Sequence, residues 1–126
     1  MKRVITTAAA PSAIGPYSQA IEANGFVFVS GQLPLDPATG AFVDGGIAEQ
    51  AEQSIKNLLA VLKAAGCTAD DVVKTTVFMI DIGDFALVNE IYGRYFSSEC
   101  PARCAMQAGA LPKGALIEIE AIAAKP

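Results

Sequence analysis

The stretch from residue 115 to 124, ALIEIEAIAA, constrains the fold most, because its side chains alternate in character with a period of two. In a β-strand, successive side chains point to opposite faces of the sheet. One face would carry Ile117, Ile119 and Ala121, and the other would carry Leu116, Glu118, Glu120 and Ile122. The sequence therefore predicts a strand with one apolar face and one face that holds two carboxylates.

A second pattern, with a period close to 3.6 residues, predicts a long amphipathic helix from Ile47. Its apolar positions are Ile47, Ala51, Ile55, Leu58, Leu59, Leu62 and Ala65. Polar residues, Gln50 and Asn57 among them, are expected largely on the opposite side. Gly66 is expected to end this helix in the left-handed conformation. Asp84 is placed to cap a second helix that runs to Phe96.

The remaining β-branched and aromatic runs predict further strands. They lie near Arg3–Thr6, Tyr17–Ala23, Phe26–Ser30, Val73–Ile80 and Arg103–Gln107. Asn24-Gly25 indicates a tight hairpin between the second and third of these strands. The order βββαβαββ predicts an α+β fold, with one mixed sheet and two helices on one face. We expect a single domain over residues 1–126, with the other sheet face free to meet partner subunits.

Hydrophobic residues make up 52% of the 126 residues, which is more than a small monomer can bury. Part of this surface is therefore expected in a subunit interface. The longest uncharged run, Val4 to Ile21, contains several polar residues and is broken by Pro11, Gly15 and Pro16. We accordingly predict no transmembrane helix, no membrane partner and a cytoplasmic location.

Charge and residue types exclude several classes of site. The net charge is −4, and the nine Lys and Arg residues form no cluster, which argues against a nucleic-acid partner. The three cysteines form no CxxC pair and the chain has no histidine, so neither a disulfide framework nor a zinc site is indicated. The cysteines are interpreted as small core residues. Catalysis would have to use carboxylate, hydroxyl, amide, thiol or guanidinium groups.

Arg103 is the only charged residue between Glu99 and Lys113. One possible partner is a carboxylate, within the chain or at a subunit interface, and the other is a bound anion. The position of Arg103 alone does not decide between them.

Glu118 and Glu120 lie among apolar neighbours, so at least one could be partly desolvated and act as a general acid or base. The pattern alone nevertheless favours a solvated strand face. Weaker candidates for a site are Tyr17, Ser30, Gln32 and Asn89.

Taken together, five segments resemble the Rid family of reactive intermediate deaminases, also called YjgF. They are IGPYSQA, VSGQLPLDPATG, VVKTTVFMIDIGDFALVNEIY, PARCA and LPKGALIEIEAIA, and in this order they cover nearly the whole chain. The resemblance implies a chorismate-mutase-like subunit in a homotrimer, with the active sites in clefts between subunits. It also implies hydrolysis of 2-imino acids, such as 2-iminobutanoate and 2-iminopropanoate, to 2-oxo acids and ammonia.

The resemblance also implies roles for individual residues. Arg103 corresponds to the ligand of the substrate carboxylate, and Glu118 to the residue that handles water or a proton. Tyr17, Ser30 and Asn89 match other substrate-binding positions, and no metal or cofactor is implied. One departure concerns Cys104, which follows the arginine where the family usually has serine. A thiol donates a weaker hydrogen bond than a hydroxyl, so this exchange bears on substrate range and rate.

Two alternatives to a deaminase stay open at this point. The first is an endoribonuclease or translation inhibitor, an activity also associated with this family. The second is a non-catalytic module that binds a small carboxylate through Arg103, or that acts as a chaperone through its apolar surface. The sequence does not predict which imino acid is preferred.

Overall fold

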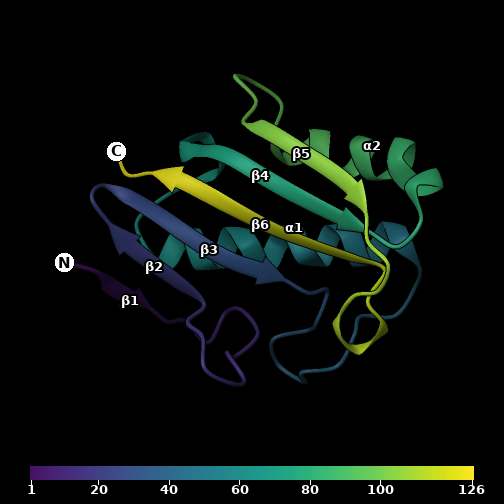
Figure 1. Cartoon of the computed structure of the whole chain (residues 1–126), viewed down its shortest axis with the longest axis horizontal. Coiled ribbons are helices and arrows are strands. Elements are labelled where there is room, and N and C mark those ends of the chain that lie inside the picture. Colours follow the sequence, from purple (N-terminus) through teal and green to yellow (C-terminus); the bar gives the residue numbers. More distant parts are fainter.

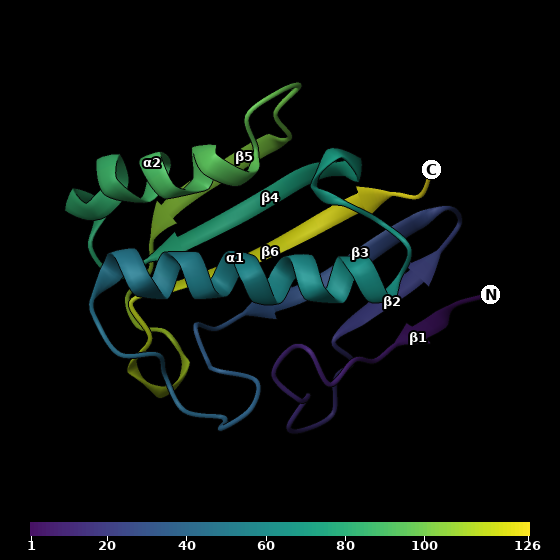
Figure 2. The ribbon, with the colours of Figure 1, turned by 180° about the vertical axis from the view of Figure 1, so that it is seen from behind.

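In the computed structural model, which describes residues 1–126, the alternating stretch forms the central part of a six-stranded mixed sheet. The strands are β1 (Arg3–Ile5), β2 (Ala20–Ala23), β3 (Phe26–Gln32), β4 (Val72–Met79), β5 (Ala102–Gln107) and β6 (Ile117–Ala124). Their order in the sheet is β1-β2-β3-β6-β4-β5, and only β4 and β5 run parallel. Helices α1 (Ile47–Ala64) and α2 (Phe85–Tyr95) lie on the same face of this sheet (Figures 1 and 2). The predicted α+β class and element order are confirmed.

The predicted alternation of β6 is confirmed in the burial of its side chains. Ile117, Ile119 and Ala121 are buried beneath the helices, whereas Glu118 is half-buried and Glu120 is exposed on the other face. We call this second face, which no helix covers, the open face. The strand therefore has the predicted apolar face, beneath the helices, and the predicted face with two carboxylates.

Helix α1 packs against β6 and β3 and ends as predicted. Gly66 adopts a φ of 83°, and its amide donates to the carbonyl of Lys63. The amide of Cys67 donates to the carbonyl of Leu62, which completes the paired hydrogen bonds of a Schellman motif. Glycine suits this position because it has no Cβ to oppose the left-handed conformation.

Two polar residues of α1 that were expected largely on its solvent side are buried instead. The side-chain carbonyl of Gln50 accepts from the amide of Leu116 at 2.9 Å. The Asn57 amide donates to the carbonyls of Leu33 and Leu35 at 3.0 and 2.9 Å. Backbone groups buried without water require such partners, so these side chains join α1 to the loops beside β3 and β6.

Three smaller expectations were wrong. Asp84 is the N-cap residue of α2, but its side chain makes no capping hydrogen bond; Asp81 caps the preceding 3₁₀ turn by accepting from the amide of Gly83. β2 begins at Ala20 rather than Tyr17, because the chain turns after Gly15, where the amide of Tyr17 donates to the Gly15 carbonyl. Of the cysteines only Cys67 is buried, whereas Cys100 and Cys104 are exposed.

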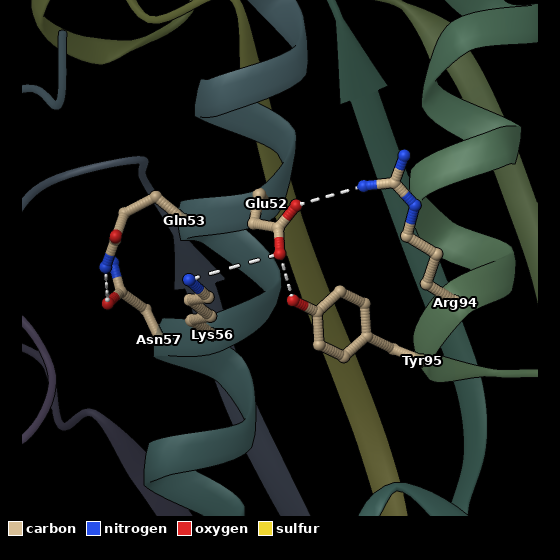
Figure 3. A network of polar contacts seen from close by, with 6 residues as sticks. All are labelled: Glu52, Gln53, Lys56, Asn57, Arg94 and Tyr95. Carbon is tan, nitrogen blue, oxygen red and sulfur yellow. Dashed lines mark hydrogen bonds and ion pairs between the residues drawn. The ribbon is translucent and has the colours of Figure 1, made fainter.

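A polar network joins the outer sides of the two helices (Figure 3). Glu52 of α1 accepts a hydrogen bond from the Tyr95 hydroxyl and forms ion pairs with Arg94 of α2 and with Lys56. Burial, and then the hydrogen bond to Glu52, raise the pKa of Tyr95 to about 12.

Neither helix combines the length and the apolar character that a membrane-crossing segment requires.

Candidate functional site

Arg103 lies on β5, the edge strand, and its side chain is held by α2. Its Nη1 donates a 2.7 Å hydrogen bond to Oδ1 of Asn89. The guanidinium carbon lies 5.2 Å from the ring centre of Phe85 and 4.9 Å from that of Tyr92, both on α2. Aromatic faces attract a cation, so these two rings and the amide fix the direction of the guanidinium.

The support beneath Arg103 is itself fixed. The Tyr92 hydroxyl shares a 2.7 Å hydrogen bond with the hydroxyl of Thr75, which is fully buried in the neighbouring strand β4. Burial raises the pKa of Tyr92 above its usual value. The ring under the guanidinium is therefore held in place as a neutral phenol.

All the partners of Arg103 within its own chain are uncharged. The chain forms five ion pairs within 4.0 Å, and none of them involves Arg103. The alternative of an intrachain salt bridge is therefore wrong. A guanidinium has five N–H donors in a fixed fork, and most of those on Arg103 remain available to an anion from outside the chain.

Glu118 lies elsewhere, in a pocket of about 510 Å³. Tyr17, Ser30 and Gln32 also line this pocket, together with Ile14, Leu33, Leu35 and Lys113. Burial raises the pKa of the Glu118 carboxyl, and the charge of nearby Glu120 raises it further. A carboxyl with a raised pKa can exchange a proton closer to neutral pH, which is the property of a general acid or base.

The loops around this pocket are held by their own hydrogen bonds. The Ser30 hydroxyl donates to the carbonyl of Ser18 at 2.6 Å, and the buried Gln32 amide donates to the carbonyl of Ser30 at 3.1 Å. The Tyr17 hydroxyl accepts from the amide of Ile14 at 3.4 Å. Three of the predicted site residues, Tyr17, Ser30 and Glu118, are thus brought together in one pocket.

The other two predicted residues, Arg103 and Asn89, do not line this pocket. In the sheet, Arg103 is paired with Thr75, whose side chain faces the helices. Glu118 is paired with Phe78, on the open face. Because neighbouring paired residues point to the same side of a sheet, Arg103 and Glu118 project from opposite faces of one chain.

The sequence did not single out three residues that belong to these two places. Phe85 and Tyr92 support Arg103, but the sequence indicated only that both lie within the predicted second helix. Lys113 lines the Glu118 pocket with a φ of 59°, a conformation that is uncommon outside glycine. The turn signal PKG could have identified this bend, but not its place beside the pocket.

Candidate metal ligands do not gather anywhere in the protein. No group of three or more His, Cys, Asp or Glu side chains lies close enough together to hold a metal ion.

Comparison with known proteins finds relatives that match nearly the whole chain. A family profile described as Endoribonuclease L-PSP matches residues 7–125. The human protein named 2-iminobutanoate/2-iminopropanoate deaminase is 57% identical, over 98% of this chain and 90% of its own.

Two solved structures share the fold. A Rid family protein of Yersinia pestis is 52% identical, with a TM-score of 0.96 over 98% of this chain and 99% of that one. Escherichia coli TdcF, solved with bound serine, is 41% identical, with a TM-score of 0.94 over the same shares of the two chains. The chain therefore belongs to the family described as Endoribonuclease L-PSP, the YjgF/Rid family that its five sequence segments resemble.

Proposed function

We propose that this protein is a hydrolytic deaminase that converts 2-imino acids into 2-oxo acids and ammonia. Relatives named 2-iminobutanoate/2-iminopropanoate deaminase are 54–57% identical to it over 98% of its length, and this similarity supports the assignment. The structural observation that carries it is the Arg103 guanidinium, which is oriented by neutral groups and has no carboxylate partner in its chain.

In this proposal Arg103 binds the carboxylate of the substrate. A planar guanidinium and a carboxylate form two parallel hydrogen bonds, which fix the orientation of the adjacent C=N group. The relative TdcF was solved with bound serine, a ligand that also has a carboxylate. Fixing the substrate in this way removes much of the entropic part of the barrier.

Glu118 would then transfer protons between water and nitrogen. It takes a proton from the water whose oxygen attacks the imine carbon, while the π electrons of C=N move to nitrogen. Because the imine is protonated before the attack, the same carboxyl returns that proton to an amino nitrogen and makes it an ammonium group. The C–N bond then breaks with its electrons moving to nitrogen, and the remaining hydroxyl gives its proton to solvent to form the 2-oxo acid. Ammonia leaves, and the cycle needs neither a metal nor a cofactor.

We further propose that the protein is a homotrimer of single-domain, chorismate-mutase-like subunits. Each site would combine Arg103 and Asn89 of one subunit with Tyr17, Ser30 and Glu118 of the next. The projection of Arg103 and Glu118 from opposite faces of one chain supports this arrangement. The open face also carries exposed apolar side chains, as an interface requires. They are Val4, Phe26, Phe28 and Met106.

Hybrid oligomers test the shared site directly. Arg103→Ala and Glu118→Gln subunits are each expected to be inactive alone. If the two are mixed, unfolded and refolded together, some interfaces combine an intact Arg103 with an intact Glu118. In a ring of three with random mixing, about a quarter of the sites become active. Release of the 2-oxo acid is measured with imines generated in situ by an amino-acid dehydratase.

A matched control mixes two variants of the same half-site, Arg103→Ala and Asn89→Ala. Because both changes fall on one side of each interface, no site should regain both residues, and the mixture should show only the average activity of the two unmixed variants. Activity of this control mixture above that average, or a monomer in light scattering at micromolar concentration, would contradict the shared site.

The description of the family profile favours one other activity, RNA cleavage. The net charge of −4 opposes it, since affinity for RNA depends largely on clustered basic side chains. Incubating the same preparation with single-stranded RNA distinguishes the two. Cleavage that Arg103→Ala and Glu118→Gln both leave intact would indicate a separate activity. Ligand binding without imine hydrolysis would indicate the carboxylate-binding module.

A further inference from the structure

The strand β3 contains an irregularity beside the Glu118 pocket. Val29 is paired with Ala121, but Gln32 is paired with Ile119. Two residues of β3, Ser30 and Gly31, therefore face a single residue of β6, which is the arrangement of a β-bulge. Bulges redirect side chains and are common next to active sites.

The Glu118 side chain lies directly against the backbone of Gly31. A Cβ added at residue 31 would be 2.6 Å from Oε2 of Glu118, 2.8 Å from its Cδ and 3.0 Å from its Cγ. Non-bonded heavy atoms pack best at about 3.5–4.0 Å, so a methyl group and this carboxyl cannot occupy their places together. The carboxyl fills the space that any other residue at this position would need.

The backbone of Gly31 does not itself require glycine. Its φ lies outside the left-handed region, in contrast to those of Gly25 and Gly66. Alanine would therefore meet no conformational strain of its own. The property of Gly31 that matters here is the absence of a side chain facing Glu118.

We propose that Gly31 is a positioning residue for the reaction, because its missing side chain lets the Glu118 carboxyl lie against β3 at the wall of the pocket. This inference rests on the proposed deaminase function. The backbone of β3 shields the carboxyl from water on one side. The other ionisable groups around it are Glu120, two residues along β6, and Lys113 and Tyr17, which line the pocket.

The first test is kinetic. Gly31→Ala should displace the carboxyl and lower kcat about 10²-fold, the loss expected from misplacing a catalytic group by roughly 1 Å. Gly93→Ala is the matched control, because Gly93 lies on the outer side of α2 with no atom within 4 Å of an added Cβ. Thermal melting of both variants establishes that they fold.

A double variant shows whether the effect passes through Glu118. In Glu118→Asp the carboxyl is carried on a side chain one methylene shorter, so a methyl at residue 31 has less to displace. Gly31→Ala should therefore cause no further loss of kcat in the Glu118→Asp background. An equal loss in both backgrounds, or full activity of the folded Gly31→Ala single variant, would overturn the proposal.

A second readout does not depend on activity. The Glu118 carboxyl carbon is followed by NMR as the pH is changed, and its signal is assigned from its absence in Glu118→Gln. In Gly31→Ala the carboxyl should move toward water, and its pKa should fall toward the ordinary value. An unchanged titration would overturn the positioning role. If the parent hydrolyses no imine but this shift occurs, the proposed function fails while the contact between Gly31 and Glu118 stands.

Discussion

Arg103 of β5 donates a 2.7 Å hydrogen bond to Asn89 of α2, and this bond sets the direction of its guanidinium. The bond joins a strand at the edge of the sheet to the helix beside it. The amide oxygen orients the cation without neutralising its charge, so the guanidinium can still bind a carboxylate from outside the chain.

Replacing Arg103 tests the geometry of carboxylate binding. Arg103→Ala should abolish imine hydrolysis. Arg103→Lys should lower kcat/KM about 10- to 100-fold, because a lysine ammonium cannot form the two parallel bonds, and charged hydrogen bonds contribute roughly 1.5–3 kcal/mol. Arg94→Lys, on the outer side of α2, is the control. An Arg103→Lys enzyme with the kinetics of the parent would exclude the bidentate role.

Asn89→Asp should produce a competing anion inside the chain. The new carboxylate has the shape of the native amide and would lie next to the Arg103 guanidinium. It should raise KM about tenfold, with a smaller effect on kcat, because the substrate must displace a charge-assisted hydrogen bond. Asn89→Ala removes the orienting bond without adding a charge. The prediction fails if Asn89→Ala raises KM as much as Asn89→Asp does.

Glu118 and Glu120 provide a matched pair of carboxylates on one strand face. Glu118→Gln should lower kcat by about 10²–10⁴-fold, the usual loss for a missing general acid or base, while binding of an unreactive 2-oxo acid is kept. Glu120→Gln should have a much smaller effect. The two are compared by steady-state kinetics and by calorimetric titration. Similar activities, both close to that of the parent, would leave Glu118 as an ordinary polar residue of the sheet.

The raised pKa of Glu118 also predicts a dependence of stability on pH. Between the unfolded and the folded pKa, the folded chain binds more protons, so the free energy of unfolding falls as pH rises through this window. Glu118→Gln lacks this titration. Relative to the parent it should be more stable at neutral pH, and this advantage should disappear as pH falls below the ordinary pKa of a carboxyl. Urea unfolding at several pH values measures the difference, with Glu120→Gln as the comparison.

The contact between Tyr95 and Glu52 gives a prediction at alkaline pH. The pKa of Tyr95 is raised from 10.0 to about 12, so the folded chain holds this proton longer than the unfolded chain. Stability that the protonated hydroxyl contributes, through its burial and its bond to Glu52, should be lost as pH rises from about 10 to about 12. Tyr95→Phe should lose roughly 1–2 kcal/mol at neutral pH and show less of this alkaline decline. Identical alkaline profiles for the two proteins would exclude the titration of Tyr95 as the source of the decline.

Local periodicity predicted β6, the extent of α1 and the left-handed glycine at its end, because each depends on neighbours within a few residues. It could not predict the burial of Asn57. An amide on the polar side of a helix is buried only if a loop with unpaired carbonyls packs there, and that loop begins 24 residues earlier.

The separation of Arg103 and Glu118 depends on information of a different kind. The alternation of β6 predicted the face of Glu118 relative to its own neighbours. The face of Arg103 follows from the parallel pairing of β5 with β4, which local patterns do not specify. The bulge at Ser30–Gly31 likewise appears only when β3 is aligned with β6.

The position of β6 has a consequence for the synthesis of the protein. β6 follows the other five strands in the sequence, yet it lies between β3 and β4 and is hydrogen-bonded to both. While a ribosome still holds residues 117–124, the hairpin of β2 and β3 and the pair β4 and β5 have no strand to join them, and their inner edges stay open. Such edges pair readily with other chains, so nascent copies on one messenger are most prone to aggregate before β6 has emerged.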